Sequence, residues 1–171
     1  LSIRKEGNTP AWGAVYEQYF QEIDKVKGQK GVLSVEKKLF VETNNGTNRQ
    51  IRPVTPEQPL RIGDKVIVRL TIRTDREMNY VFLKDLRAGC FEPADQLSSP
   101  ESRDGIWYYR SPKDVSENFF INRLPEGTFV LEYPVYVSRS GEYAGGISTI
   151  QCMYAPEFVS HTAGESLRIM P

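Results

Sequence analysis

A two-residue alternation of apolar and polar side chains restricts the fold of this 171-residue chain more than any other feature. Residues 65–73 and 128–138 both show it, because one face is apolar and the other carries charged or polar groups. The apolar faces are Val66, Val68, Leu70 and Ile72, and then Phe129, Leu131, Tyr133, Val135 and Val137. This period is typical of half-buried β-strands.

Further strands are predicted at residues 33–42, 78–83, 147–152 and 167–170, and short turn sequences separate most of them. Helical spacing is confined to residues 15–26, where a strand fits equally well. Residues 87–108 show no strand pattern and are expected to form a long loop of functional importance. Pro134 predicts a sheet edge or a bulge. The chain is therefore predicted to be all-β, an antiparallel β-sandwich.

Composition excludes several classes of partner. The 22 Lys and Arg residues balance the 22 Asp and Glu residues, which removes the electrostatic argument for binding nucleic acid or an anionic membrane. No apolar run approaches the roughly 20 residues of a membrane-spanning helix. The chain begins at Leu1, which suggests a piece of a longer protein.

The two cysteines, Cys90 and Cys152, have none of the spacings of a zinc site. They fit either one disulfide in an oxidising compartment or two buried free thiols, and the second is the simpler interpretation. Neither a metal nor a cofactor is predicted.

Catalytic chemistry has little support. The single histidine, His161, has no nucleophile elbow near it and is expected to be a solvated or hydrogen-bonded residue. Nothing in the sequence brings the carboxylates Asp85, Glu92, Asp95 and Glu157 together as glycoside hydrolysis requires. Asp85, with Arg87 two residues away, is expected to pair with arginine or backbone donors. The chain is predicted to be non-enzymatic, without catalytic residues.

Two groups of residues could bind something. Trp107, Tyr108 and Tyr109 could stack on a sugar ring or lie at a protein interface. In a sandwich, however, alternating aromatic residues more often supply the core, and adjacent ones divide between the two faces. Met153 and Tyr154 lie where a strand ends before Pro156, and they fit either a small satellite core cluster or a functional surface.

The first thirty residues differ from the rest. They carry the aromatic residues Trp12, Tyr16, Tyr19 and Phe20, and they lead into the Gly- and Lys-rich residues 27–31, which are expected to be a linker. A lone aromatic strand cannot bury itself, so this segment is expected to dock on the sandwich or to belong to a preceding domain.

Residues 146–158, GISTIQCMYAPEF, resemble the C-terminal end of bacterial alpha-2-macroglobulins, particularly the Bacteroidetes-type branch. Other segments agree in the same order along nearly the whole chain. They are residues 12–19, 63–66, 85–93, 119–120, 124–129 and 132–133.

The resemblance implies a large, multi-domain protease trap of the periplasm or outer cell envelope, in which a protease cuts a bait region and a thioester then acylates the protease. Residues 31–171 would be the last macroglobulin-type β-sandwich, at the position of the receptor-binding domain in animal relatives. Residues 1–30 would supply closing strands of a preceding CUB-like domain. Partners would be the neighbouring thioester and CUB-like domains and, through the parent protein, target proteases.

The resemblance also implies a role for the turn near residue 153. The thioester motif Cys-x-Glu-Gln is absent from this chain, so the reactive group would lie elsewhere in the parent. In bacterial relatives a Met-Tyr-x-Pro loop of this last domain covers the thioester, and the matching residues are Met153, Tyr154 and Pro156. The alternative function is a cell-surface carbohydrate-binding or adhesion module that uses Trp107, Tyr108 and Tyr109.

Overall fold

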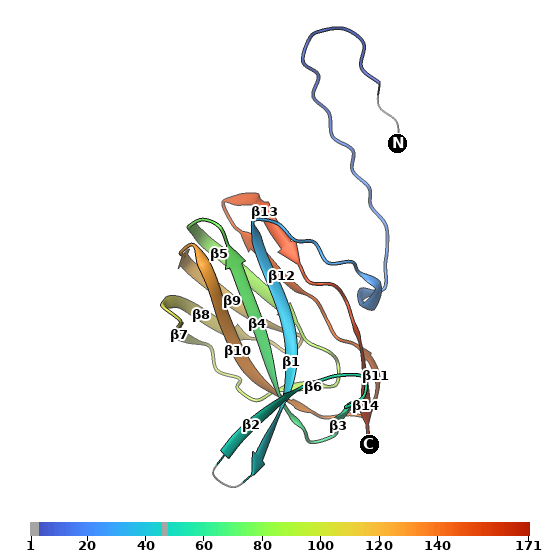
Figure 1. The fold of residues 1–171 in the computed structure, drawn as a ribbon, viewed down its shortest axis with the longest axis vertical. Helices are drawn as coiled ribbons and strands as arrows, with labels where there is room; N and C mark the ends of the chain where they lie inside the picture. The colour runs from blue at the N-terminus through green and yellow to red at the C-terminus, as the bar shows by residue number, and fades with distance from the viewer. Residues whose placement is uncertain (1–3, 46–47) are drawn as a thin grey trace.

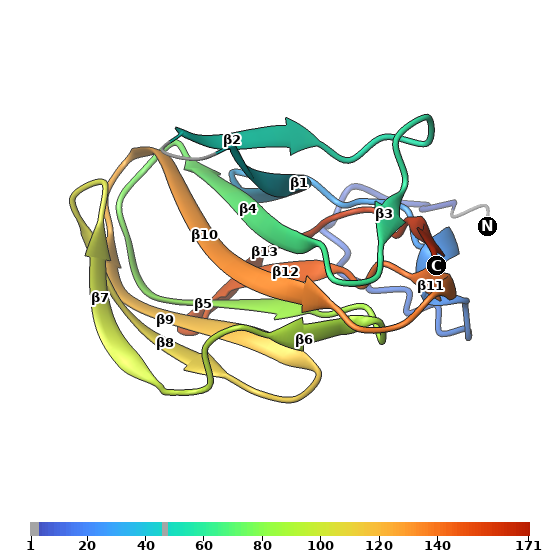
Figure 2. The same ribbon diagram turned by 90° about the horizontal axis from the view of Figure 1, so that it is seen from below.

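Two antiparallel β-sheets lie face to face in this chain, of which the computed structural model describes residues 4–45 and 48–171 (Figures 1 and 2). The first sheet has the spatial order β2–β1–β4–β10–β6. Its strands are β1 (Leu33–Asn45), β2 (Asn48–Pro53), β4 (Lys65–Thr74), β6 (Phe91–Pro93) and β10 (Gly127–Val137).

The second sheet has the order β13–β12–β5–β9–β8–β7 and is antiparallel throughout. Its strands are β5 (Met78–Leu86), β7 (Ser99–Arg103), β8 (Ile106–Pro112), β9 (Ser116–Leu124), β12 (Ser148–Cys152) and β13 (Ala155–His161). A smaller third sheet joins β11 (Gly141–Ala144), β14 (Ser166–Met170) and β3 (Leu60–Arg61), and its β14–β3 pair is parallel. The predicted all-β sandwich is confirmed.

The core fills the space between the first and second sheets. The predicted inward faces of β4 and β10 are buried, and they meet the buried faces of β5, β9 and β12. Fully buried members include Leu70, Ile72, Leu131, Leu83, Phe119, Ile121 and Ile150. The apolar residues that alternate with polar ones along these strands therefore form the core, as predicted from the sequence.

Residues 87–108 differ from the predicted long loop. They contain β6, β7 and the start of β8, and the turn between β7 and β8 has positive φ at both Asp104 and Gly105. The prediction failed because β6 and β7 are short and rich in polar residues and proline. Pro134, in contrast, lies where the prediction placed it, since β6 pairs only with residues 135–137 of β10 and leaves the preceding part of β10 as a sheet edge.

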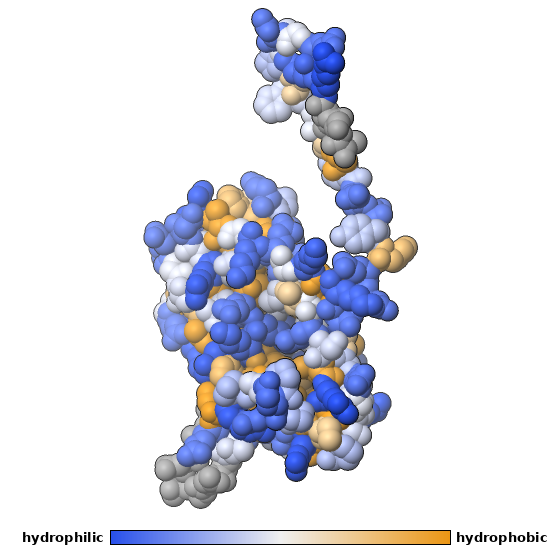
Figure 3. All heavy atoms as spheres, turned by 45° about the vertical axis from the view of Figure 1, so that its right-hand side comes forward, coloured by the Kyte–Doolittle hydropathy of each residue, from blue (hydrophilic) through white to orange (hydrophobic). Residues whose placement is uncertain are grey.

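The N-terminal segment extends away from the sandwich (Figures 1 and 3). Within residues 4–32 there is one short 3-10 helix, η1 (Ile23–Lys25), and one isolated bridge, but no strand. The strands expected from a preceding domain are thus not formed by this chain alone, and the assignment of residues 1–30 to such a domain stays a prediction.

The predicted linker at residues 27–31 packs against the sandwich. Gln29 and His161 exchange backbone hydrogen bonds of 2.9 and 3.0 Å, and the Gly164 N–H donates to the Val26 carbonyl at 2.8 Å. A Cβ on Gly164 would lie 1.8 Å from the Ile23 carbonyl oxygen, so only glycine permits this close approach. Residues 23–29 are consequently fastened to the end of β13.

Candidate functional site

The turn between β12 and β13 presents Met153 and Tyr154 to solvent. The pairing of β12 with β13 shifts register between Gln151 and Cys152, so that Cys152 lies opposite Ala155. Met153 and Tyr154 are the two residues of the turn between them. Met153 is 56% exposed and Tyr154 is 80% exposed. The structure therefore places them outside the core rather than in a satellite cluster.

Pro156 is also exposed and lies at the start of β13. Proline has no backbone N–H to donate. Because β13 is an edge strand of the second sheet, Pro156 can be accommodated on the side of the strand that has no neighbour. The three residues matched to the Met-Tyr-x-Pro loop are thus together at one tip of the sandwich, and their role stays a prediction.

Three contacts fasten this turn to the beginning of β5. The Met153 N–H donates to the Tyr80 carbonyl at 2.9 Å, and the Cys152 thiol donates to the Asn79 carbonyl at 3.3 Å. The rings of Tyr80 and Tyr154 meet edge to face, with centroids 5.1 Å apart and an interplanar angle of 80°. Tyr80 was not predicted as a site residue, because no local pattern in the sequence indicates its contact with a turn more than seventy residues later.

The outer face of the second sheet continues from this tip as a row of aromatic side chains. Phe82 and Phe120 stack with ring centroids 4.9 Å apart, and Tyr109 lies opposite Phe120 on the next strand. Trp107, 71% exposed, lies two residues before Tyr109 on the same face of β8. The two candidate groups of the sequence analysis therefore share one sheet face.

Tyr108 does not belong to that surface. It is only 6% exposed, it points into the core, and its ring packs against Phe119 with centroids 5.7 Å apart. Its hydroxyl donates to Glu101 at 3.0 Å, and burial, followed by that carboxylate, raises the pKa of Tyr108 to about 12. The expected surface group is corrected to Trp107 and Tyr109, because alternation along β8 turns the residue between them inward.

The outer face of the first sheet is chemically different. Charged side chains on its neighbouring strands form ion pairs, among them Lys65 with Glu42 at 2.9 Å and Arg69 with Glu132 at 2.6 Å. Arg103 adds a third, to the other oxygen of Glu132 at 2.7 Å. The outer face of the first sheet is thus rich in ion pairs, whereas that of the second sheet carries the row of aromatic side chains.

A polar cluster lies inside the sandwich and joins the two sheets. Lys37 of β1 donates to Asp85 Oδ1 of β5 at 2.8 Å, and to the carbonyls of Leu86 and Gly145. Ser148 also donates to Asp85 Oδ1, and the Tyr133 hydroxyl donates to Asp85 Oδ2. Burial and then Asp85 raise the pKa of Tyr133 well above its usual value.

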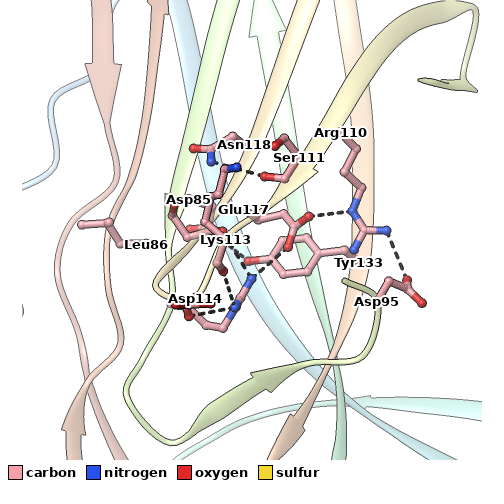
Figure 4. A network of polar contacts seen from close by, with 12 residues as sticks. Asp85, Leu86, Asp95, Arg110, Ser111, Lys113, Asp114, Glu117, Asn118 and Tyr133 are labelled. Carbon is pink, nitrogen blue, oxygen red and sulfur yellow. Dashed lines mark hydrogen bonds and ion pairs between the residues drawn. The ribbon is translucent and has the colours of Figure 1, made fainter. Parts of the chain in front are cut away.

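A second cluster adjoins the first across the Tyr133 ring (Figure 4). Glu117, fully buried, accepts hydrogen bonds from Arg87 Nη2 at 2.9 Å and from Arg110 Nε at 2.7 Å. Asp85 therefore pairs with Lys37 rather than with Arg87, contrary to the sequence expectation. Two donors of the second cluster, Arg87 Nε and Arg110 Nη2, are buried without a hydrogen-bond partner among the described residues, while the other contacts named here join the two sheets or neighbouring strands.

The remaining candidate residues do not converge. His161 ends β13 and its Nδ1 lies 3.1 Å from the Thr162 carbonyl. Asp95 contacts Arg110 at 3.2 Å. Within residues 4–45 and 48–171, no group of three His, Cys, Asp or Glu side chains could hold a metal ion, and no helix is long and apolar enough to cross a membrane. Cys90 and Cys152 are separate buried thiols, as the simpler interpretation held.

A hollow of about 780 Å³ lies elsewhere, between β1, the β2–β3 connection and β14. Its apolar lining includes Leu39, Val54, Leu60 and Leu167. None of the residues predicted to form a site faces it.

Residues 33–157 match the family described as the Bacterial Alpha-2-macroglobulin MG10 domain. The chain belongs to the bacterial alpha-2-macroglobulin family. The resemblance drawn from the sequence is thereby confirmed at the level of the family, while the Bacteroidetes-type branch stays a prediction.

Solved structures agree with this alpha-2-macroglobulin fold. Salmonella alpha-2-macroglobulin reacted with methylamine is 21% identical with a TM-score of 0.65, over 85% of this chain and 10% of that one. Native Escherichia coli alpha-2-macroglobulin, from domain MG7 to the C-terminus, is 17% identical with a TM-score of 0.64, over 84% of this chain and 24% of that one. At these identities the similarity shows the fold.

One curated protein is also similar in sequence. Circularly permutated Ras protein 2 of Dictyostelium discoideum is 28% identical over 109 residues, which are 64% of this alpha-2-macroglobulin chain and 3% of that protein. The chain thus spans only a small part of each relative, and their whole-protein activities do not transfer to it directly.

Proposed function

We propose that this chain is the non-catalytic C-terminal β-sandwich domain of a bacterial alpha-2-macroglobulin-like protease inhibitor, and that it shields or docks on the thioester domain of its parent. The observation that carries the proposal is the exposed Met153–Tyr154 turn, presented at the tip of the sandwich and fastened to β5. A large exposed apolar and aromatic group of this kind is typical of a contact surface.

The chemistry of the turn suits the shielding of a thioester. A thioester persists when water and amines are kept from its carbonyl carbon. Met153 supplies a flexible apolar side chain that fills gaps, and Tyr154 supplies a rigid ring with one hydroxyl that can orient the contact. Pro156 limits the conformations of the chain that leaves the turn.

Two related structures support the same proposal. The Salmonella protein is described as reacted with methylamine, and the Escherichia coli protein, 18% identical over 85% of this chain and 14% of that one with a TM-score of 0.65, as activated by porcine elastase. By analogy, the partners of this chain are the thioester and CUB-like domains of its own polypeptide, and target proteases through the parent. Its location is the periplasm or the outer cell envelope.

The test is made on the full-length parent. Methylamine is added, and the release of one thiol is followed together with the gain in intact mass. In Tyr154→Ala the reaction is expected to be faster than in the wild type while the domain stays folded. An unchanged rate would reject the shielding role.

A second candidate function is a carbohydrate-binding or adhesion surface on β8. Trp107 and Tyr109 favour it, because both are exposed on one face two residues apart, as required for stacking against a sugar. The burial of Tyr108 leaves two aromatic residues for this role.

A further inference from the structure

Tyr80 adopts a backbone conformation that is unusual for its residue type. Its φ is +57°, in the left-handed region that a residue with a Cβ avoids. Only one other described non-glycine residue, Asp104, has a positive φ, and it lies in a turn, whereas Tyr80 lies inside β5. Strained residues of this kind persist where surrounding contacts hold them, and they gather at functional sites.

The strained residue changes which side chains of β5 face the core. Met78 and Val81 are both buried although three positions separate them, and Asn79 and Tyr80 between them are exposed. A regular strand would turn one of these two residues inward. Counted from Val81, alternation places the Tyr80 ring on the outer side with Phe82, where it meets Tyr154. The left-handed residue reverses the facing of the two residues before it, so that Asn79 is exposed and Met78 is buried.

Tyr80 contacts the turn through two independent groups. Its carbonyl accepts the Met153 N–H at 2.9 Å, and its ring meets the Tyr154 ring edge to face at 5.1 Å. Tyr154 is 80% exposed, and the Tyr80 ring is the aromatic contact that it makes within the described residues. Without that ring, a tyrosine on a two-residue turn would be free to change rotamer.

We propose that Tyr80 is a positioning residue for Tyr154, which holds the tyrosine ring of the turn in one orientation before any partner is bound. The proposal rests on the proposed function, because it assigns a second residue to the same shielding contact. Tyr80 acts through Tyr154 and does not itself need to touch the thioester. A pre-oriented ring lowers the entropic cost of forming the shielding contact.

Two substitutions separate the ring of Tyr80 from its backbone. Tyr80→Gly removes the ring but adopts positive φ without strain, so the backbone bond to Met153 can be kept and the variant should fold. Tyr80→Phe keeps the ring and removes only the hydroxyl. Tyr136→Ala is the matched control, because Tyr136 is a comparably exposed tyrosine on the outer face of the first sheet.

The first measurement is the rate of methylamine reaction in the full-length parent. Tyr80→Gly is expected to react about 2- to 10-fold faster. This range is the free energy of one aromatic pair, expressed as the increase in the fraction of molecules whose turn no longer shields the thioester. Tyr80→Phe and Tyr136→Ala should match the wild type. Adding Tyr80→Gly to Tyr154→Ala should give no further increase, since Tyr80 acts through Tyr154.

The second measurement uses this chain alone and does not depend on a thioester. The χ1 rotamer of Tyr154, measured by NMR three-bond couplings, should be a single one in the wild type and in Tyr80→Phe, and it should average over rotamers in Tyr80→Gly. If Tyr154 keeps a single rotamer in Tyr80→Gly, or if Tyr80→Gly leaves the methylamine rate unchanged where Tyr154→Ala raises it, the positioning role is overturned. If Tyr154→Ala leaves the methylamine rate unchanged while Tyr80→Gly makes the Tyr154 rotamer average, positioning is supported and the proposed shielding function fails.

Discussion

Lys37 of β1 and Asp85 of β5 form an ion pair in the interior of the sandwich, with Nζ 2.8 Å from Oδ1. Their side chains are 5% and 0% exposed, and they belong to opposite sheets. The pair occupies inward positions that would otherwise hold apolar side chains. Such a pair is favourable only while both partners and their hydrogen bonds are present.

Removal of the lysine should therefore be severe. Lys37→Met leaves the Asp85 carboxylate buried without its cation, and we expect a loss of about 3–5 kcal/mol in the free energy of unfolding. Urea unfolding at pH 7 measures this loss. The control Lys38→Met removes an exposed neighbour and should change stability by less than about 0.5 kcal/mol. Equal effects of the two substitutions would contradict the buried ion pair.

Glu132 should make stability depend on pH. Burial alone would raise its pKa, but hydrogen bonds from Arg103 and Arg69 outweigh this effect and hold the pKa below its ordinary value. Its stabilising contribution is thus present above the pKa of the unfolded chain, near 4.5, and is lost as the pH falls through the lower folded value.

Glu132→Gln tests this sign. We expect the variant to lose about 1 kcal/mol at pH 7, and we expect this deficit to shrink as the pH falls below 4.5 through the lowered folded pKa, because the wild-type carboxylate then becomes protonated in the folded as well as in the unfolded protein. Urea unfolding over a series of pH values from 7 downwards provides the comparison. A deficit that is the same at every pH would show that charge is not responsible.

Cys90 should be chemically inert in the folded protein. Burial raises the pKa of its thiol to about 11, so at pH 8 only about 0.1% is thiolate, the reactive form. Iodoacetamide at pH 8 should leave Cys90 unmodified in the native chain and alkylate it in urea. Peptide mass spectrometry locates the modification. Rapid alkylation under native conditions would mean that this region opens.

The exposed turn should contribute little to folding. We expect Met153→Ala and Tyr154→Ala in the isolated chain each to change the free energy of unfolding by less than about 1 kcal/mol. In Tyr154→Ala, the loss of the ring contact with Tyr80 adds to this change. Leu131→Ala, in the core, should cost about 2–5 kcal/mol. Chemical denaturation of the three variants makes the comparison. A core-sized loss at Tyr154 would assign that residue to stability instead of binding.

The carbohydrate-binding alternative makes its own prediction. If Trp107 and Tyr109 form a sugar platform, glycans should bind the isolated chain with millimolar to micromolar dissociation constants, about −4 to −8 kcal/mol. Trp107→Ala should then abolish the binding. Calorimetric titration with a panel of glycans tests this prediction, and an absence of heat across the panel removes the alternative.

The sheets were predictable where a strand is long and its alternation is regular. β4 and β10 met both conditions, and their buried faces are those read from the sequence. β6 has three residues and β7 has five, with polar or proline residues at most positions. Their strand character comes from pairing with β10 and β8, which local sequence does not encode.

The position of the candidate site could be predicted from the sequence, but the residues that hold it in place could not. Met153, Tyr154 and Pro156 were found through a resemblance in local sequence, and the structure brings them to one tip. Tyr80 and Lys37 were not found. The first depends on a left-handed backbone and a distant contact, and the second is a charge on an inward position whose partner is 48 residues away.

The attachment of Gln29 to His161 and of Val26 to Gly164 has a mechanical consequence. β13 is attached to the upstream chain at one end, and at the other end it begins directly after Tyr154. A pull on residues 4–22 would load the Val26–Gly164 and Gln29–His161 hydrogen bonds before it reaches β1 through the covalent chain. The edge strand that begins after Tyr154 would thus feel the tension before the first sheet does.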